Sequence, residues 1–335
     1  MRQEKPKSLQ ISVIALLMWA LVVLPLAADE TARKAGTRAF AFLKRDVGAR
    51  PVGMGGAFTG FADDETTLFY NPGATVNLDG RRGIAGYQNF IAGINAGFLG
   101  YLHPLGEREK IGGFINYIDY GSFIRTDNTG AELGEFGGGS FVFGLNYSRE
   151  IGAKFQAGGN AKLIYSDIES FTATGLAVDL GLRYKIKEQP REFRKRGYGA
   201  VGLTVQNLGG MLSTFAANAE KDPLPIIFRL GVAGRPRGVP LHFAGDVILP
   251  ADNDIQIALG AEYAEIEYLA LRAGWASFGE NFRTVADDGA LAGFSFGVGF
   301  DFERMNIGYS ISPMNDLGES HRITVTHRFD TPLER

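Results

Sequence analysis

The sequence predicts an all-β protein, a transmembrane antiparallel β-barrel of about 14 strands with a short N-terminal hatch or plug segment. Three observations lead to this fold. From about residue 81 onward, apolar and polar residues alternate with a period of two. The connections between these segments alternate between tight turns and longer loops. A leader typical of exported proteins precedes them.

The N-terminus predicts export from the cytoplasm. Residues 11–28 are uncharged and mostly apolar, and they follow a short stretch that carries basic residues. Pro25 and the small pair Ala27 and Ala28 stand where a signal peptidase site is expected. We therefore expect residues 1–28 to be a cleaved signal peptide. The alternative is an uncleaved anchor helix, because the apolar run approaches the length of a membrane span.

The composition excludes several classes of protein. The 335 residues include 46 Gly, 25 Phe and 12 Tyr but no Cys, which rules out disulfides, thiolate metal sites and cysteine nucleophiles. A formal net charge of −3 does not suggest a nucleic-acid-binding face. After the leader, no segment approaches the ~18 consecutive apolar residues of a membrane-spanning helix. A β-barrel escapes that test because its strands alternate.

The segment before the barrel has a different texture. Residues 29–80 lack the alternation and are interrupted by glycines at 53–56 and by Asn71-Pro72-Gly73. Short helical or coil pieces are expected there, and the segment is too long for a simple linker, so we expect it to plug the barrel. The expected division is a signal peptide at 1–28, a hatch at 29–80, a barrel at 81–329 and a C-terminal tail at 330–335.

The barrel segments are expected to be long strands. In residues 176–186, Leu176, Val178 and Leu180 share one face, whereas Ala177 and Asp179 share the other. Most segments match the ~9–11 residues of a tilted strand that crosses a bilayer. The expected strands are 82–92, 94–104, 110–121, 137–149, 153–167, 173–187, 197–208, 225–236, 239–249, 254–264, 266–277, 290–302, 304–312 and 319–329.

The connections distinguish a barrel from a soluble sandwich. After even-numbered strands they are mostly short and polar, as at 106–110 and 150–153. After odd-numbered strands they are mostly longer, as at 122–136 and 209–224. Outer-membrane barrels have short periplasmic turns on one rim and longer external loops on the other. A soluble sandwich explains the alternation of residues equally well but not the alternation of loop lengths.

Charged residues fall on the polar face of the expected strands. An Arg or Lys on the lipid side at mid-depth costs about 2–4 kcal/mol, so these residues are expected to point into the lumen and pair there. They are Lys154, Lys162, Asp179, Arg183, Lys185, Arg229, Asp246, Glu262, Arg272, Asp301 and Arg322.

Several stretches resemble a known family. The longest is GARPVGMGGAFTGFADDETTLFYNPG at 48–73, which resembles the N-terminal signature of the PorV/PorQ-type outer-membrane proteins, members of the wider FadL-like barrel superfamily. Further resemblances lie at 206–210, 223–234, 259–263, 271–275, 293–302 and 311–329. Together they extend over nearly all of the chain after the leader.

The resemblance implies two functions. PorV-like members dock secreted proteins by their C-terminal sorting domains and shuttle them in type IX secretion. FadL-like members pass hydrophobic molecules through the hatch into a lateral opening. In both cases the resemblance implies a hatch, with gate candidates Gly53, Gly55, Gly56, Asn71 and Pro72. The family's Asn-Pro-Ala element reads Asn-Pro-Gly here, which is expected to give the local backbone more freedom at residue 73.

The external segment 209–224 contains the candidate binding residues. Met211, Leu212 and Phe215 are apolar in a loop that is expected to face water. An exposed apolar patch often marks a binding surface. The alternative is that the loop folds over the pore and buries these side chains in its own lid.

Catalytic and metal sites are not expected. Gly293-Phe294-Ser295-Phe296-Gly297 matches G-x-S-x-G, but that motif requires a strand–turn–helix, and here more strand follows. Ser295 is instead expected to face the lumen between lipid-facing rings. The four histidines lack metal-ligand spacing, and the acidic cluster at 63–65 is expected to be solvated loop charge. The glycines at 53–56 lack the context of a phosphate loop, so hatch packing is preferred.

The sequence therefore predicts a non-enzymatic outer-membrane β-barrel of a Gram-negative-type bacterium, without cofactors. The first functional hypothesis is a PorV/PorQ-like docking or shuttle component for secreted proteins. The alternative is a FadL-like channel for hydrophobic small molecules, and a third reading is a structural barrel without a transport role. The expected partners are the outer-membrane bilayer with either secreted cargo or hydrophobic ligands, and not nucleic acid.

Overall fold

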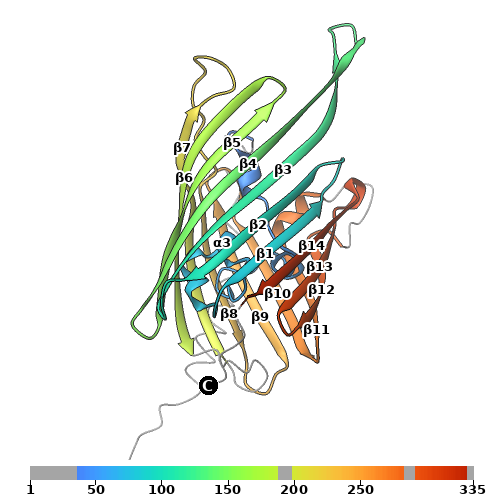
Figure 1. Ribbon diagram of the computed structural model, residues 1–335. Coiled ribbons are helices and arrows are strands. Elements are labelled where there is room, and N and C mark those ends of the chain that lie inside the picture. The colour runs from blue at the N-terminus through green and yellow to red at the C-terminus, as the bar shows by residue number, and fades with distance from the viewer. Residues whose placement is uncertain (1–35, 188–197, 283–290, 330–335) are drawn as a thin grey trace, which may run out of the picture.

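A closed barrel of 14 antiparallel strands dominates the computed structural model (Figure 1). The structure describes residues 36–187, 198–282 and 291–329. Each strand pairs with its neighbours in the sequence, and β14 closes on β1 from Arg82↔Arg328 to Asn89↔His321. The predicted fold class and strand number are confirmed. The expected signal peptide at 1–28 and the tail at 330–335 lie outside the described residues.

The strands run in chain order around the barrel. They are β1 (Arg82–Asn89), β2 (Asn95–Pro104), β3 (Glu109–Thr126), β4 (Glu132–Ile151), β5 (Phe155–Ile168), β6 (Phe171–Lys187), β7 (Tyr198–Ser213), β8 (Ile227–Arg235), β9 (Leu241–Pro250), β10 (Gln256–Ile266), β11 (Leu269–Ala276), β12 (Phe294–Phe302), β13 (Met305–Pro313) and β14 (Glu319–Arg328). We call the end with the turns after even-numbered strands the lower rim and the opposite end the upper rim.

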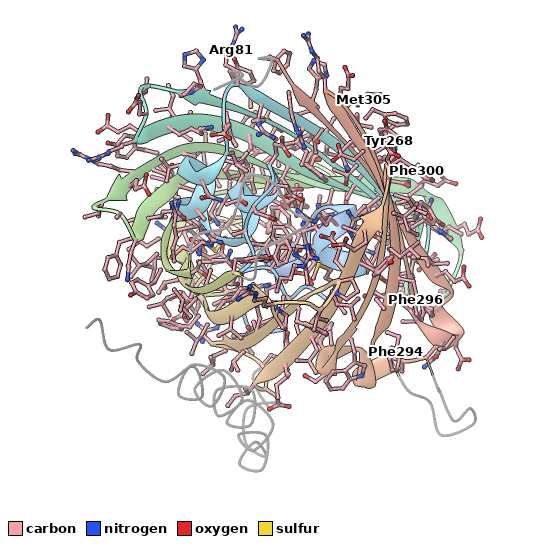
Figure 2. All side chains as sticks on the ribbon, turned by 90° about the horizontal axis from the view of Figure 1, so that it is seen from below. Arg81, Tyr268, Phe294, Phe296, Phe300 and Met305 are labelled. Atoms are coloured by element: carbon pink, nitrogen blue, oxygen red, sulfur yellow. The ribbon has the colours of Figure 1, made fainter. Side chains whose placement is uncertain are left out.

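Alternation along each strand separates an apolar outer face from a polar lumen. On β4, Phe143 and Leu145 are exposed on the outside, whereas Asn146 and Ser148 are buried inside. Seen from below, Tyr268, Phe296 and Phe300 lie on the outer side of the wall and the hatch lies in the lumen (Figure 2). This arrangement suits a barrel in lipid, where apolar side chains face the hydrocarbon and polar side chains pair inside.

The barrel wall is much taller on one side. Strands β3 to β7 are 14 to 20 residues long, whereas the others have 8 to 11. The predicted loop 122–136 is therefore wrong, since β3 and β4 continue to the pair Thr126↔Glu132. They project above the upper rim as a hairpin in which the Phe123 and Phe136 rings stack at 5.5 Å (Figure 1). Irregular pairing near Gly121, with φ of 77°, hid this extension from the alternation pattern.

The hatch occupies the lumen as a chain of short helical turns. They are η3 (Ala41–Lys44), α2 (Ala49–Gly53), α3 (Thr67–Tyr70) and η4 (Pro72–Asn77). Helices this short are marginal alone, so contacts with the surrounding wall must hold them. At the upper rim, η5 (Ser277–Phe282) and η6 (Asn315–Leu317) lie in connections between strands. Among the described helices, none has the length and apolar character needed to span a bilayer.

Candidate functional site: the plugged lumen

A buried ion network clamps the hatch to the wall near the lower rim. The Arg50 guanidinium of α2 donates two hydrogen bonds of 2.8 Å to the Glu262 carboxylate of β10. It also pairs with Asp63 at 2.7 Å and Asp64 at 3.1 Å, and Arg272 of β11 donates to Glu262 at 2.6 Å. Burial acts to lower the pKa of Arg50, but the carboxylates of Asp63, Glu262 and Asp64 raise that pKa well above its ordinary value. The Arg50 guanidinium therefore stays charged at any ordinary pH.

The acidic cluster belongs to this network, so the prediction of solvated loop charge is wrong. Asp63 and Asp64 both contact Arg50, and the Glu65 carboxylate pairs with Arg82 of β1 at 3.2 Å. Burial, together with the neighbouring Asp64, raises the pKa of Glu65. Sequence reasoning missed Arg50, because its partner Glu262 is brought close only when the barrel closes. The available signal was a single basic residue in a stretch of small and apolar residues.

A second clamp fixes the hatch backbone directly to a wall carboxylate. The Asp246 carboxylate of β9 accepts hydrogen bonds from the Phe58 N–H at 3.1 Å and the Thr59 N–H at 3.0 Å. Arg183 of β6 donates from Nε to the Gly60 carbonyl at 2.9 Å. The expected inward placement of Asp246 and Arg183 is thus observed. These contacts satisfy hatch backbone groups that would otherwise be buried without partners.

Most of the predicted lumenal charges point inward. Those that are buried are Lys162, Asp179, Arg183, Arg229, Asp246, Glu262, Arg272 and Arg322. Lys185 is half-buried beside Glu150, and Asp301 is exposed at the lower mouth of the lumen. The prediction for Lys154 is wrong, because β5 begins after it and its ammonium lies 5.8 Å from the Tyr184 ring centre. A residue in a turn need not follow the inward and outward alternation of side chains in the next strand.

The gate candidates Asn71 and Pro72 lie where the hatch meets the tall wall. The fully buried Asn71 amide donates to the Thr59 carbonyl at 3.0 Å and to the Leu182 carbonyl of β6 at 3.2 Å. The Pro72 carbonyl accepts from the Asn146 amide of β4 at 3.2 Å. The pair therefore ties the end of α3 and the start of η4 to two wall strands.

The glycine candidates are sites of close approach between backbones. A Cβ on Gly53 would lie 3.1 Å from the Gly297 Cα, and a Cβ on Gly55 would lie 2.7 Å from the Trp275 N and O atoms. Gly55 and Gly56 also have positive φ values of 68° and 81°. A Cβ on Gly56 would lie 2.9 Å from the Asp46 carboxylate. The structure thus places these glycines against the wall or within the hatch, with no room for a side chain.

Ser295 occupies the inward position predicted for it. It is buried between the exposed rings of Phe294 and Phe296 on β12, and its hydroxyl accepts a hydrogen bond from the Gly55 N–H at 3.2 Å. The G-x-S-x-G sequence is therefore part of a strand that supports the hatch. Among the described residues, no group of three His, Asp or Glu side chains could hold a metal ion.

An apolar cluster fills the upper lumen between the hatch and the tall wall. Phe40 and Phe42 of the hatch pack with Phe114 of β3 and with Val142 and Ile164 of the neighbouring strands. Leu224, from the connection after β7, is buried in the same cluster. We call these residues the upper chamber. A second apolar cluster, which includes Phe58 and Phe61, packs among the polar clamps, so apolar and ionic contacts are interleaved in the lumen.

The external-loop candidates contribute to this chamber in different ways. Met211 and Phe215 are partly buried against it, whereas Leu212 is exposed. The prediction that 209–224 is wholly a loop is wrong, because β7 continues to Ser213. Met211 follows a bulge between Val178 and Leu180 that turns it inward. The lid alternative therefore describes Met211 and Phe215, and only Leu212 keeps the exposure expected of a binding anchor.

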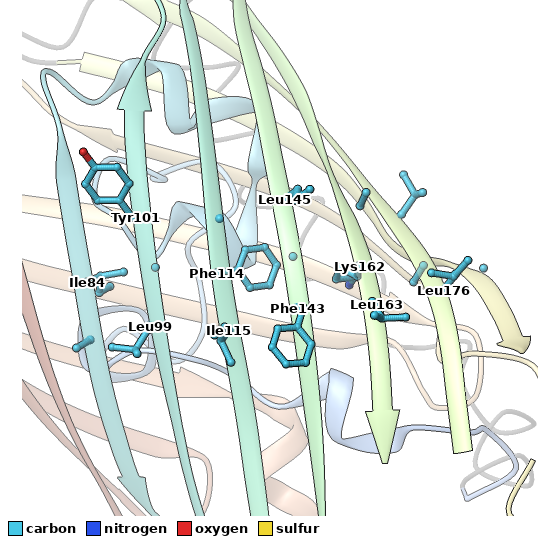
Figure 3. A pocket seen from close by; sticks show the side chains of 18 of the residues that line it. Ile84, Leu99, Tyr101, Phe114, Ile115, Phe143, Leu145, Lys162, Leu163 and Leu176 are labelled. Carbon is cyan, nitrogen blue, oxygen red and sulfur yellow. The ribbon is translucent and has the colours of Figure 1, made fainter. Parts of the chain in front are cut away.

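The protein has two large hollows, one inside the lumen below the hatch and one on the outer surface of the wall. A polar vestibule of about 1300 Å³ opens below the hatch and is lined by residues of the Arg50 clamp and of the lower rim. An apolar groove of about 1340 Å³ lies on the outer wall and crosses the tall strands (Figure 3). Leu99, Ile115 and Phe143 point outward into this groove. Phe114 of the upper chamber also lines the groove, as does Ala177, which packs in the same apolar cluster, so one layer of wall separates the chamber from the groove.

Comparisons with known proteins agree on the fold. Neither a family model nor a curated protein sequence matches the chain. The toluene transporter TodX of Pseudomonas putida superposes with a TM-score of 0.56 at 15% identity, covering 84% of this chain and 96% of that one. The toluene transporter TbuX of Ralstonia pickettii gives 0.56 at 12%, covering 85% and 98%.

A FadL homologue of Pseudomonas aeruginosa extends this agreement. It superposes with a TM-score of 0.51 at 11% identity, covering 82% of this chain and 96% of that one. At such low identity the likeness concerns the arrangement of the strands, and the PorV/PorQ resemblance stays a prediction. The chain has the fold of the FadL-type outer-membrane channels.

Proposed function

We propose that the protein is an outer-membrane channel for small hydrophobic molecules, and that the hatch is its gate. The observation that carries this proposal is the upper chamber, the apolar cluster that lies in the lumen beside the tall wall. A general porin has a polar, water-filled interior and gains nothing from buried phenylalanines there. An apolar chamber instead attracts molecules that water rejects.

The surroundings of the chamber support this function. Below it, the Arg50 and Asp246 clamps close the lumen with ionic and polar contacts. Beside it, the wall is thin and carries an apolar groove on its lipid side. A hydrophobic molecule in the chamber therefore meets an ionic layer below and an apolar layer beside it. The toluene transporters with the same fold are consistent with this substrate class.

A reversible cross-link between hatch and wall tests the proposal. A Cβ on Gly308 of β13 would lie 3.4 Å from the Ala49 Cβ of α2. A disulfide needs a Cβ–Cβ separation of about 3.5–4.5 Å, so the double variant Ala49→Cys/Gly308→Cys needs only a slight adjustment. Because the chain has no other cysteine, the oxidised variant carries a single defined bond.

Uptake of radiolabelled toluene and of a labelled fatty acid is then measured in proteoliposomes. The reduced double variant should take up at least one of them above empty liposomes, and oxidation should abolish the difference. The single variants Ala49→Cys and Gly308→Cys, treated with the same oxidant, are the controls and should keep their uptake. Undiminished uptake with the cross-link verified on a gel shows that the hatch is not the gate. Uptake of neither compound by the wild-type protein contradicts the channel itself.

A docking role for secreted proteins is supported by one separate observation. The β3–β4 hairpin projects beyond the upper rim and exposes Phe123, Ile124 and Leu133. Removing residues 209–224 is a poor test of docking, because Leu224 is part of the upper chamber. Removing residues 122–135 leaves the chamber intact. If docking is the function, this deletion should stop release of secreted cargo while the barrel still folds, and normal cargo release would count against it.

A further inference from the structure

Three buried or half-buried arginines of the hatch and the wall lie close to two carboxylates inside the lumen. Asp46, in the hatch, pairs with Arg229 of β8 at 3.3 Å. Arg45 reaches only neutral partners, the side-chain oxygens of Gln88 at 2.5 Å and Asn116 at 2.6 Å. Arg322 of β14 donates to the Ser312 hydroxyl at 3.3 Å. Asp246 of β9, which accepts hydrogen bonds from two hatch N–H groups, also attracts Arg229, so three guanidinium charges face two carboxylates.

The excess positive charge is not relieved by other side chains nearby. Burial, together with repulsion from Arg322, lowers the pKa of Arg45 to about 10. The two neighbouring lysines are already neutralised, Lys162 by Asp179 at 2.6 Å and Lys44 by Asp252 at 2.6 Å. Taking an unpaired charge out of water costs several kcal/mol, so the remaining surplus of one positive charge calls for a counter-ion.

An internal cavity lies where such an ion is needed. It has a volume of about 50 Å³ and is lined by polar groups of both the hatch and the wall and, on one side, by apolar residues that include Phe114 and Val142. The polar residues that line it include Arg45, Asp46, Tyr70, Asn116, Gln206 and Arg229. A water molecule needs roughly 10–15 Å³ measured in this way, so there is room for a chloride-sized ion with water.

Unused hydrogen-bond donors accompany the cavity. Within the described part of the chain, the Nε–H groups of Arg45, Arg229 and Arg322 have no acceptor. Arg229 is more than nine-tenths buried and lines the cavity. A buried donor without a partner is expensive, and a guanidinium binds anions through its N–H groups.

We propose that this cavity binds a small monovalent anion, which bridges the hatch and the wall. Arg45 binds it from the hatch, and Arg229 from β8, with the charge of Arg322 from β14 behind them. Asp46 and Asp246 reduce the attraction but leave one positive charge in excess. The anion stabilises the closed lumen, because a ligand that binds only the folded state shifts unfolding by mass action. This inference does not depend on which molecules the channel carries.

Thermal unfolding of the whole protein in detergent tests the site. The midpoint is measured in sodium gluconate and then in sodium chloride, bromide or acetate at the same ionic strength. Gluconate is too large for the cavity, so the midpoint should rise in the small anions and level off with concentration. Protection by the halides identifies a free ion as the ligand, and protection by acetate alone identifies a carboxylate. An equal midpoint in all four salts overturns the proposal and means that the cavity holds only water.

Substitutions locate the site. Arg45→Gln should weaken anion binding roughly tenfold, the effect expected when a charged hydrogen-bond donor is lost. Arg149→Gln is the matched control, because Arg149 is exposed on the barrel exterior and its loss should leave the anion effect unchanged. If Arg45→Gln does not fold, anomalous scattering from wild-type crystals grown in bromide decides the question. A bromide peak beside Arg45 and Arg229 supports the site, and crystals with ordered water alone there contradict it.

Discussion

At the scale of single residues, the chain uses glycine to bring hatch and wall into backbone contact. A Cβ on Gly73 would lie 2.2 Å from the Gly181 carbonyl, so the Asn-Pro-Gly variant of the family element has a steric reason. The expected gain in local freedom is not what the structure shows, because Gly73 is buried and packed. The same logic applies to Gly55, which lies between two wall strands near Leu259 and Trp275.

Gly55→Ala should displace the hatch, and Gly152→Ala is its matched control. Both glycines have a positive φ, 68° and 64°, so alanine costs about 1–2 kcal/mol at either position. Only Gly55 lacks space, since no atom lies within 4 Å of a Cβ at Gly152. Overpacking at Gly55 should add about 1–3 kcal/mol, seen as a lower urea midpoint and faster proteolysis of the hatch. Equal effects of the two variants would show that the close approach does not matter.

At the scale of elements, the short helices of the hatch derive their stability from the wall. Helix α2 has only five residues, and its Arg50 reaches Glu262 on β10 and Asp63 beyond the next turn. The guanidinium also lies 4.7 Å from the Phe61 ring centre, which adds a cation–π contact. With Arg272 of β11 also bound to Glu262, the ion network holds two hatch segments and two strands in a fixed relation.

Arg50→Ala should loosen the hatch while the barrel stays closed. Removing one partner of a buried ion pair costs about 3–5 kcal/mol, and here Asp63 and Asp64 lose their ion pair with the guanidinium while Glu262 keeps its pair with Arg272. The expected result is rapid hydrogen exchange in residues 48–65 with slow exchange retained in the strands, measured by mass spectrometry. Arg149→Ala, on the exposed outer surface, should change neither. Uniformly faster exchange in the strands as well would mean that the clamp supports the whole barrel.

At the scale of the whole molecule, the exposed apolar surface and the uneven wall determine how the barrel sits in a membrane. Leu145 is 72% exposed and Leu133 is 60% exposed, both on β4, yet their environments differ. Leu145 lies on the outer groove, within the band that lipid covers. Leu133 lies in the projecting hairpin, where β4 pairs with β3 but not with β5, whose pairing with β4 begins at Gly138.

Leu145→Arg and Leu133→Arg should therefore behave oppositely in a bilayer. An arginine at mid-depth on the lipid face costs about 2–4 kcal/mol, so Leu145→Arg should unfold at lower urea in liposomes. Leu133→Arg should leave the midpoint unchanged, because water surrounds the hairpin. Band shifts on unboiled gels give the same readout in detergent. Equal tolerance of both substitutions would place the membrane band elsewhere on the barrel.

The sequence alone determined the periodic features of this protein. A period of two over many segments, with turns and loops in alternation, specifies a barrel because each strand must separate lipid from lumen. The inward position of Ser295 followed from the same periodicity. The register of Arg50 with Glu262, the loss of alternation in β3 and the inward turn of Met211 depend on residues far apart in the chain. Only the closed tertiary structure decided them, because the energy of a buried charge and the position of a bulge both depend on which strand lies opposite.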